Sequence, residues 1–480
     1  MITQLASFSL FLHELLDLQH ISHMKHLFFG GTDPKTQEKV AVSKASGKVE
    51  GTEYNGHVVV VDKEPSFLVD VLPYYGNSIL LVINHLIYLY TGYILTPFWY
   101  MYMGCPFTNL LGPKDNENLT KRSEPTFAKD KRFLPPLYLY VCLNAASWVW
   151  QLTLMSESMD HTDSFLFRYK PETKAQYFCF SFHFAFSLAN AITAGHELMH
   201  KREFVNKVMG TLPYSMFLYT HFLDEHIQGH HKNVATPEDP ATANLNENVF
   251  HFIVRSTIGS HVKTYEREVQ RMVRRNKGVQ PTLAQKVFEN KLTFCFLLHA
   301  AILSTIYLTL GWASLKHQLV YTLFGVLFLE GINYLEHYGL QRKKDENGYY
   351  EAINKYHSWN QRTAPISFKL QRHSDHHAHS YRPYQILRRF DEAPTLPFDY
   401  LHCFVLQFCP PLWFYCVNPR VQAVKDFHEG KPRSDVTFGC DQPLTEQDKH
   451  IQYLGYCYMT LFQVVWTCYF GFFIKMSSSL

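Results

Sequence analysis

The chain has 480 residues and a formal net charge of +3, and only 18% of its residues are charged. Ordinary soluble proteins carry roughly 25% charged residues, and so small a net charge gives no reason to expect nucleic acid as a partner. The ten cysteines are scattered without a C-x-x-C pair. The sequence therefore predicts neither a disulfide framework nor a built-in iron–sulfur electron carrier.

Apolar stretches near the length of a membrane span recur along the chain, since about 20 helical residues cross the hydrocarbon core. The mean hydropathy is only −0.17 because long polar segments dilute these stretches. Phe67 to Leu111 is long enough for two spans that break near Thr91 and Gly92. Four more spans are predicted: Leu134 to Met155, Gln176 to Ala194, Lys291 to Trp312 and Gln318 to Tyr338.

Basic residues in the connecting loops predict the orientation, because Lys and Arg favour the cytoplasmic side. They lie before the third span, after the fourth and before the fifth: Lys114, Lys121, Arg122, Lys129, Lys131, Arg132, Lys201, Arg202, Arg267, Arg271, Arg274, Arg275 and Lys277. About six spans then place both ends of the membrane core in the cytoplasm.

The segment from Phe204 to Asp224 is also apolar and long enough to cross. Crossing would put the histidines that follow it on the opposite face from those that precede it. Gly210 and Pro213 interrupt the segment, and proline inside a helix removes a hydrogen bond and clashes with the preceding turn. We therefore expect a re-entrant or interfacial hairpin that returns to the cytoplasm.

Three regions are predicted along the chain. Residues 1–65 form a cytoplasmic N-terminal extension without an evident signal peptide, residues 66–425 form the membrane-embedded domain, and residues 426–480 form a tail. Within the tail, Tyr453 to Ile474 is either a seventh span or an interfacial anchor.

Nine histidines in four short blocks carry the strongest functional signal. Residues three or four positions apart lie on one face of a helix and can aim at a common point. An ordinary tetrahedral zinc site uses four ligands and a catalytic one only three, so nine candidates indicate two cations, and neutral imidazole suits iron, zinc, copper or nickel. The candidate ligands are His196, His200, His226, His230, His231, His337, His373, His376 and His377.

Carboxylates accompany each block and are predicted to orient the ligating imidazoles from outside the metal site. These are Glu197, Glu225, Glu336 and Asp375. No catalytic residue beyond the metal site is assigned.

The four blocks, in their order, resemble the integral-membrane alkane hydroxylase (alkane 1-monooxygenase) family, within the membrane fatty acid desaturase and hydroxylase superfamily. They are HELMHK at His196, EHIQGHHKNVATPEDP at Glu225, NYLEHYGL at Asn333 and LQRHSDHHAHSYRPYQ at Leu370. The similarity extends from about Leu134 to Lys425. NYLEHYGL is the most specific block, because it separates the hydroxylases from the desaturases.

The resemblance implies an all-α membrane protein with a cytoplasmic-side di-iron cap held by the nine histidines. It also implies insertion of one oxygen atom from O2 into a terminal C–H bond of an alkane, which gives a primary alcohol. Electrons would come from a separate rubredoxin and an NAD(P)H-dependent reductase. A fatty acyl or aryl-methyl hydroxylase, or a desaturase, of the same superfamily is the alternative.

An alkane can be gripped only by apolar burial, worth about 0.8 kcal/mol per CH₂. Trp99, Trp148 and Trp150 are candidate walls of a channel for it, although packing or interface roles are the commoner ones for such residues.

Two other classes are compatible with part of the pattern. HELMH matches the H-E-x-x-H signature of zinc proteases, with Glu197 as the general base, but this leaves seven of the nine histidines unexplained. A metal-ion transporter would also use intramembrane His and Glu. That class predicts ligands near the bilayer midplane and internal symmetry, and no repeat is visible in the sequence.

Overall fold

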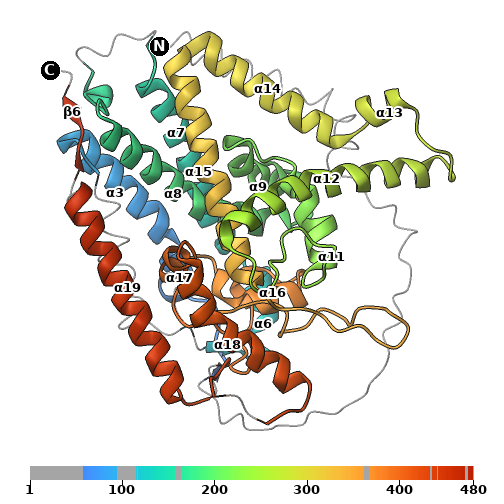
Figure 1. Cartoon of the computed structure of the whole chain (residues 1–480). Helices are drawn as coiled ribbons and strands as arrows, with labels where there is room; N and C mark the ends of the chain where they lie inside the picture. Colours follow the sequence, from blue (N-terminus) through green and yellow to red (C-terminus); the bar gives the residue numbers. More distant parts are fainter. Residues whose placement is uncertain are drawn as a thin grey trace. The chain divides into compact units, whose positions relative to one another are not determined.

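The computed structural model describes residues 58–94, 115, 117–157, 164–361, 367–432, 435–439, 442–470 and 474–478. Almost all of the predicted N-terminal extension, the predicted span after Gly92 and Trp99 lie outside these residues. The described chain is mostly helical, with a few strands of two or three residues (Figure 1). It divides into two compact units, of which the first contains Tyr265–Phe296 and the second contains Asn55–Thr264 and Leu297–Leu480.

The described part of the first unit consists of three helical pieces and the loops between them. It contains the end of α12 (Val249–Arg275), all of α13 (Leu283–Phe288) and the beginning of α14 (Lys291–Leu310). Thr282 and Gln285 form a capping box at the start of α13, which satisfies backbone donors there. Within α12, Glu268 accepts a hydrogen bond of 2.8 Å from the Arg271 guanidinium, one helical turn later.

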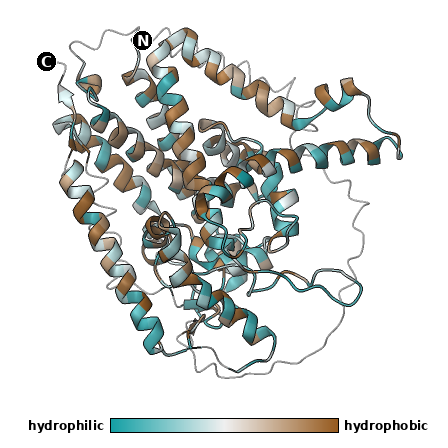
Figure 2. Ribbon diagram, viewed as in Figure 1, coloured by the Kyte–Doolittle hydropathy of each residue, from teal (hydrophilic) through white to brown (hydrophobic). Residues whose placement is uncertain are grey.

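Among the residues that the structure describes, four helical segments are long and apolar enough to cross a membrane: Phe67–Thr91, α8 (Lys174–Met199), α14 and α15 (Trp312–His337). Phe67–Thr91 comprises η1 (Phe67–Val71), η2 (Leu72–Tyr75) and α3 (Gly76–Thr91). The predicted third span is also helical, as α7 (Leu134–Leu154), but its prolines and polar side chains leave it outside these four. The brown stretches of Figure 2 follow the apolar helices.

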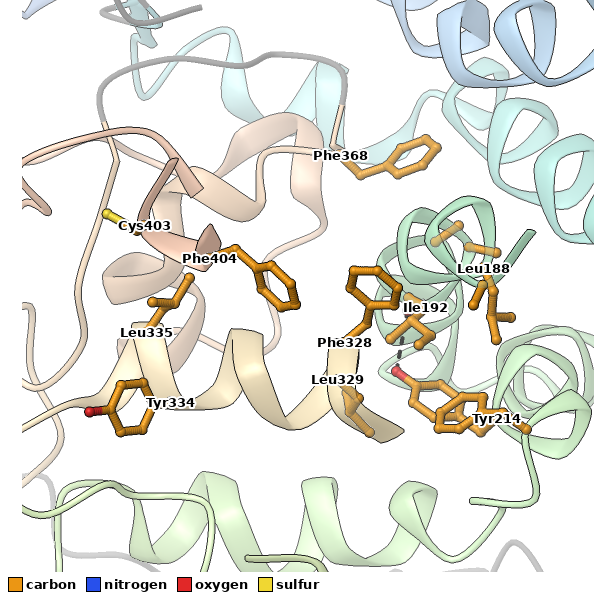
Figure 3. Close-up of a cluster of buried hydrophobic side chains, with 14 of the residues drawn as sticks. Leu188, Ile192, Tyr214, Phe328, Leu329, Tyr334, Leu335, Phe368, Cys403 and Phe404 are labelled. Carbon is orange, nitrogen blue, oxygen red and sulfur yellow. Dashed lines mark hydrogen bonds between the residues drawn. The ribbon is translucent and has the colours of Figure 1, made fainter. Parts of the chain in front are cut away.

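Helix α8 is the centre of the second unit and packs against α7, α9 (Phe204–Met216) and α15 (Figure 1). Its side chains are buried around much of its circumference, including Phe180, Phe184 and Leu188. A helix that is apolar on most sides lies in a protein core or crosses a membrane. Leu188 of α8 and Phe328 of α15 belong to the same buried cluster (Figure 3).

The segment from Phe204 to Asp224 turns back, but its interruption is not where the sequence predicted it. Pro213 lies inside α9, which continues to Met216. Its ring is accommodated because Gly195 of α8 has no side chain: a β-carbon there would lie 3.1 Å from the Pro213 Cγ. The helix is broken instead at Leu218, whose φ of 59° is left-handed, and α10 (Phe222–Asp224) follows.

Other helical elements lie before α7, between α7 and α8, and after α15, and α16 (His373–Ala378) among them carries the last three histidines. These elements are η7 (Leu370–Arg372), α16, η8 (Tyr384–Ile386), α17 (Tyr400–Leu406), α18 (Pro410–His428) and α19 (Glu446–Phe470), with α6 (Glu124–Lys129), η4 (Lys131–Phe133) and η5 (Phe165–Phe167) earlier in the chain. A buried ion pair of 2.7 Å between Arg420 and Asp448 joins α18 to α19. Helix α19, which contains most of the predicted tail segment, is not among the four candidate spans.

Short strand pairs fasten distant parts of the second unit. β1 (Val59–Val61) pairs in parallel with β3 (Glu117–Leu119). β2 (Tyr93–Ile94) and β4 (Tyr169–Lys170) pair with the last described residues, β5 (Ile474–Lys475) and β6 (Ser477–Ser478). The end of the described chain is therefore anchored beside α3 and α8.

Candidate metal centre

Two histidines lie at the end of α8. Thr173 and Gln176 form a capping box where the helix begins, and the helix is regular through Met199, with His200 as its cap. The four-residue spacing places both rings on one face, with 5.0 Å between the ring centroids of His196 and His200.

The second block is wound as a π-helix, η6 (Glu225–His230), followed by the single turn α11 (His231–Asn233). Single π-helical turns are uncommon and occur frequently at functional sites. His226 Nε2 lies 2.6 Å from His196 Nε2 and 2.9 Å from His231 Nε2. The wide turn thus brings the second block onto the first.

His337 ends α15, and the last three histidines lie on α16. His373 Nε2 is 3.2 Å from His337 Nε2 and 3.0 Å from His377 Nε2. His376 Nε2 is 3.1 Å from His231 Nε2. All four blocks therefore meet, and the structure brings together the nine histidines singled out from the sequence.

The nine side chains form two adjacent clusters, defined by ligand atoms that lie within 4.8 Å of one another. The first cluster is His196, His200, His226, His231 and His376. The second cluster joins two overlapping groups, His230, His337 and His377, and Glu336, His337 and His373. The adjacent pairs His230–His231 and His376–His377 each contribute one ring to each cluster. Consecutive helical residues can do so because they point in directions about 100° apart.

The donor set suits metal cations. Neighbouring ligands on one cation at about 2.1 Å would lie about 3 Å apart, close to the observed distances between Nε2 atoms. Burial, followed by the charges of neighbouring histidines, lowers the pKa of His226, His231 and His376 well below the usual value. Burial lowers the pKa of His200 to about 4, and its buried Nε2 has no hydrogen-bond partner among the described residues. Neutral imidazole is the ligating form.

Asp239 orients a ring of the second cluster, and the sequence reasoning missed it. Its Oδ2 lies 2.9 Å from His230 Nδ1 and accepts from Thr242 Oγ1 at 2.6 Å. A carboxylate on Nδ1 fixes the tautomer that presents Nε2 to a metal. The position lies in the quoted block ATPEDP, but it follows His230 across a loop, where helical spacing gives no signal.

The four carboxylates chosen from the sequence lie in different surroundings. Glu336 belongs to the second cluster itself, with Oε2 3.3 Å from His373 Nε2. Glu225 contacts Thr264 Oγ1 at 3.3 Å.

The other two carboxylates contact neighbouring groups outside the two clusters. Glu197 pairs with Lys201 at 2.9 Å, and Asp375 accepts from His379 and from the Arg388 backbone at 2.7 Å each. The orienting role of these four residues stays a prediction.

An apolar cavity of about 50 Å³ opens beside both clusters. Ile192, Tyr214, Phe328 and Leu329 lie together around it (Figure 3). Its lining is Ala189, Ile192, Thr193, His196, Tyr214, Phe222, His226, His230, Phe328, Leu329, Ile332, Asn333, Glu336, Leu370 and His373.

Two tryptophans expected as channel walls pack elsewhere. Trp148 donates to Gln318 at 2.7 Å, and Trp150 packs against Phe184 with 5.5 Å between ring centroids. Neither tryptophan lines the cavity beside the histidines, and their role as channel walls stays a prediction. Indole rings pack as readily against helix neighbours as around a ligand.

Comparison with known proteins identifies the relatives of this region. The fatty acid desaturase family model matches residues 173–407, which contain both clusters. Alkane 1-monooxygenase 2 of Alcanivorax borkumensis is 37% identical over 244 residues, which are 50% of this chain and 62% of that protein.

Two further relatives match nearly the same share of the chain. Alkane 1-monooxygenase 1 of Pseudomonas aeruginosa is 38% identical over 238 residues, 49% of this chain and 61% of that protein. The xylene/toluene monooxygenase hydroxylase component of Pseudomonas putida is 30% identical over 240 residues, 48% of this chain and 60% of that protein. The chain thus spans about three fifths of the length of these curated relatives.

Proposed function

We propose, from the homology of this chain to alkane 1-monooxygenases within the fatty acid desaturase superfamily, that it is a membrane di-iron monooxygenase. It would insert one oxygen atom from O2 into a terminal C–H bond of an alkane or a similar apolar chain and release a primary alcohol. The observation that carries this proposal is the meeting of nine histidines from four blocks in two clusters beside an apolar cavity.

The two clusters would hold one iron each. His196, His200, His226, His231 and His376 offer five nitrogens to the first, and His230, His337, His373 and His377 offer four to the second, with Glu336 as a further candidate ligand. The irons would supply the oxygen activation. Asp239 would hold His230 with Nε2 free for the metal.

The cavity would bind the end of the substrate through the apolar part of its lining. Ile192, Phe328 and Leu329 offer only apolar contacts, so binding would grow with chain length by about 0.8 kcal/mol per buried CH₂. Selection among substrates would then depend on shape and length.

The reducing electrons would come from outside the chain. The balanced reaction consumes RH, O2, two electrons and two protons and gives ROH and water. A rubredoxin-type one-electron carrier and its NAD(P)H-dependent reductase are the proposed donors, which agrees with the absence of a C-x-x-C pair in the sequence.

The proposed location is a multi-pass membrane protein with its metal centre on the cytoplasmic side. His196 and His337 lie at the carboxyl ends of α8 and α15, both long and apolar enough to span. Basic residues follow each helix directly, namely Lys201 and Arg202, and Arg342 and Lys343. Such residues favour the cytoplasmic face.

The rival zinc-protease interpretation has less support. In the first cluster, His196 and His200 of HELMH lie with three histidines from other blocks, which a single three-ligand zinc site does not need. Glu197, the general base of that mechanism, pairs with Lys201.

The test is the metal content of the purified, detergent-solubilised chain, measured together with hydroxylation of octane or a longer alkane. Rubredoxin, its reductase and NADH are added, and a fatty acid and a xylene are assayed in parallel. Two irons per chain and 1-octanol support the proposal. One zinc without oxidation overturns it, and product from only the fatty acid or xylene moves the chain to another branch of the superfamily.

A further inference from the structure

A buried carboxyl group lies inside α15, two helical turns before His337. Glu330 is 1% exposed in a helix apolar enough to cross a membrane. Ionisable side chains in such helices are expensive to keep and usually functional. The metal clusters and their ligands account for Glu336 and His337 but give Glu330 no role.

Glu330 has one contact that leads toward the cavity. Asn333 Nδ2 donates to Glu330 Oε2 at 3.4 Å, and Asn333 lines the cavity together with Glu336 and His230. The cavity volume of about 50 Å³ exceeds the roughly 10–15 Å³ that one water needs. The Asn333 amide donates to Glu330 and cannot take its proton, so the path from this carboxyl group to the site would need a water that bridges Glu330 Oε2 and the cavity beside Asn333.

A second contact leads away from the cavity. Tyr219 Oη donates to Glu330 Oε1 at 2.8 Å and lies 3.2 Å from Ser260 Oγ. Ser260 Oγ lies 3.0 Å from His221 Nε2. This chain of contacts thus joins three elements. Glu330 lies on α15, Tyr219 and His221 lie in the loop after α9, and Ser260 lies on the part of α12 that belongs to the second unit.

The outer end of the chain of contacts reaches a partly exposed residue. The rings of His221 and His261 lie 3.7 Å apart between centroids. His221 is buried, whereas His261 on α12 is partly exposed. Tyr219 and Ser260 are buried as well.

Each linking side chain can both accept and donate a proton. A hydroxyl rotates to suit its partners, and imidazole has two distinct nitrogens. Ser260 Oγ is also within 2.9 Å of the Thr257 carbonyl, so rotation of its hydroxyl selects between that acceptor and Tyr219. Apolar side chains of the same volume would fill this space without the free-energy cost of desolvation that these buried polar side chains incur.

We propose that Glu330 is the internal proton donor of the metal centre and that Tyr219, Ser260 and His221 reload it from the outer end of this chain of contacts, beside the partly exposed His261. The proposal rests on the proposed function, whose reaction takes up two protons and two electrons per O2. The Glu330 O–H bond breaks as its proton passes through a cavity water to the O2 oxygen atom that leaves as water. The carboxylate then takes the proton of Tyr219 Oη, which is replaced from Ser260 Oγ and in turn from His221 Nε2, and His221 takes a replacement proton from water at the outer end.

The experiment compares Glu330→Gln, Tyr219→Phe and Glu330→Asp with the unaltered chain, all loaded with iron. Tyr334→Phe is the matched control, because Tyr334 is buried on the same helix and donates to the Glu247 carbonyl at 2.6 Å outside the chain of contacts. Three quantities are measured: iron content, alcohol formed per NADH consumed, and the ratio of rates in H2O and D2O.

We expect Glu330→Gln and Tyr219→Phe to keep their iron, to lose about tenfold or more in rate, and to show a larger D2O effect with less alcohol per NADH. Glu330→Asp should recover part of the rate, and Tyr334→Phe should match the unaltered chain. Normal rates and D2O effects in both variants would overturn the relay, as would a loss of iron that accounts for the lost rate. If the unaltered chain oxidises no substrate, the proposed function and the relay fall together.

Discussion

Gly195 of α8 and Gly210 of α9 face each other so closely that a β-carbon on either one would lie 2.8 Å from the carbonyl oxygen of the other. A β-carbon on Gly210 would also lie 2.7 Å from the Met199 nitrogen. Backbone atoms cannot yield as a flexible side chain does, so only glycine fits here. This contact is made one residue before His196 and fixes the end of α8 against the segment that leads to His226.

Substituting Gly210→Ala should lower the unfolding temperature in detergent and the iron content together. The added methyl group forces the two helices apart, and such overpacking costs about 1–3 kcal/mol. Val205→Ala is the control, because Val205 lies on the same helix and is 62% exposed. An unchanged unfolding temperature and iron content for Gly210→Ala would contradict the role given to this contact.

Substituting Asp239→Asn should weaken iron binding roughly 10- to 100-fold, as measured by competition with a chelator. The amide keeps the shape of the carboxylate but not the charge that holds His230 through Nδ1. Asp426→Asn removes a carboxylate that accepts from Lys431 near the end of α18 and should leave iron affinity unchanged. Equal affinities of both variants and the unaltered chain would show that Asp239 does not position a ligand.

Substitution of two different histidines tests whether the clusters, rather than histidine content alone, bind the iron. His337→Ala removes a ring of the second cluster and should abolish oxidation and release one of two irons. His379→Ala removes a ring that belongs to neither cluster and bonds to Asp375, so both irons should remain. Elemental analysis after desalting gives the stoichiometry, and full iron content in His337→Ala would remove it from the proposed ligands.

Substituting Ala189→Leu should shift activity toward shorter substrates. Ala189 lines the cavity, and the larger side chain displaces substrate methylenes, each worth about 0.8 kcal/mol or roughly fourfold in affinity. The measurement is the ratio of kcat/KM for hexadecane and octane. Ala301→Leu on α14, where the side chain is exposed, should leave that ratio unchanged, and equal ratios for both variants would mean that the substrate lies elsewhere.

The helices and the histidine blocks were predictable because both follow from local periodicity. Spacing of four residues places His196 and His200 on one helix face whatever surrounds them. The apolar length of α8 and α15 likewise predicts long buried helices. For the same reason the break after α9 was misplaced: Pro213 is a strong local signal, but the space left by Gly195 on a different helix accommodates it.

The assignment of ligands to clusters could not be predicted from the sequence. His230 and His231 are adjacent yet lie in different clusters, as do His376 and His377, and only the packing of four segments decides which ring faces which neighbour. The π-helical winding of Glu225–His230 and the loop that returns Asp239 to His230 are also tertiary outcomes. Local propensity carries no information about either.

The distribution of ligands along the chain also sets the order in which the two clusters receive their ligands during biosynthesis. Four of the five histidines of the first cluster lie between His196 and His231, whereas the second cluster has only His230 before α15 is made. A nascent chain therefore contains four of the five first-cluster ligands while it holds only one histidine of the second. Both clusters then wait for α16, which delivers His373, His376 and His377 in a single helical turn and closes the two at once.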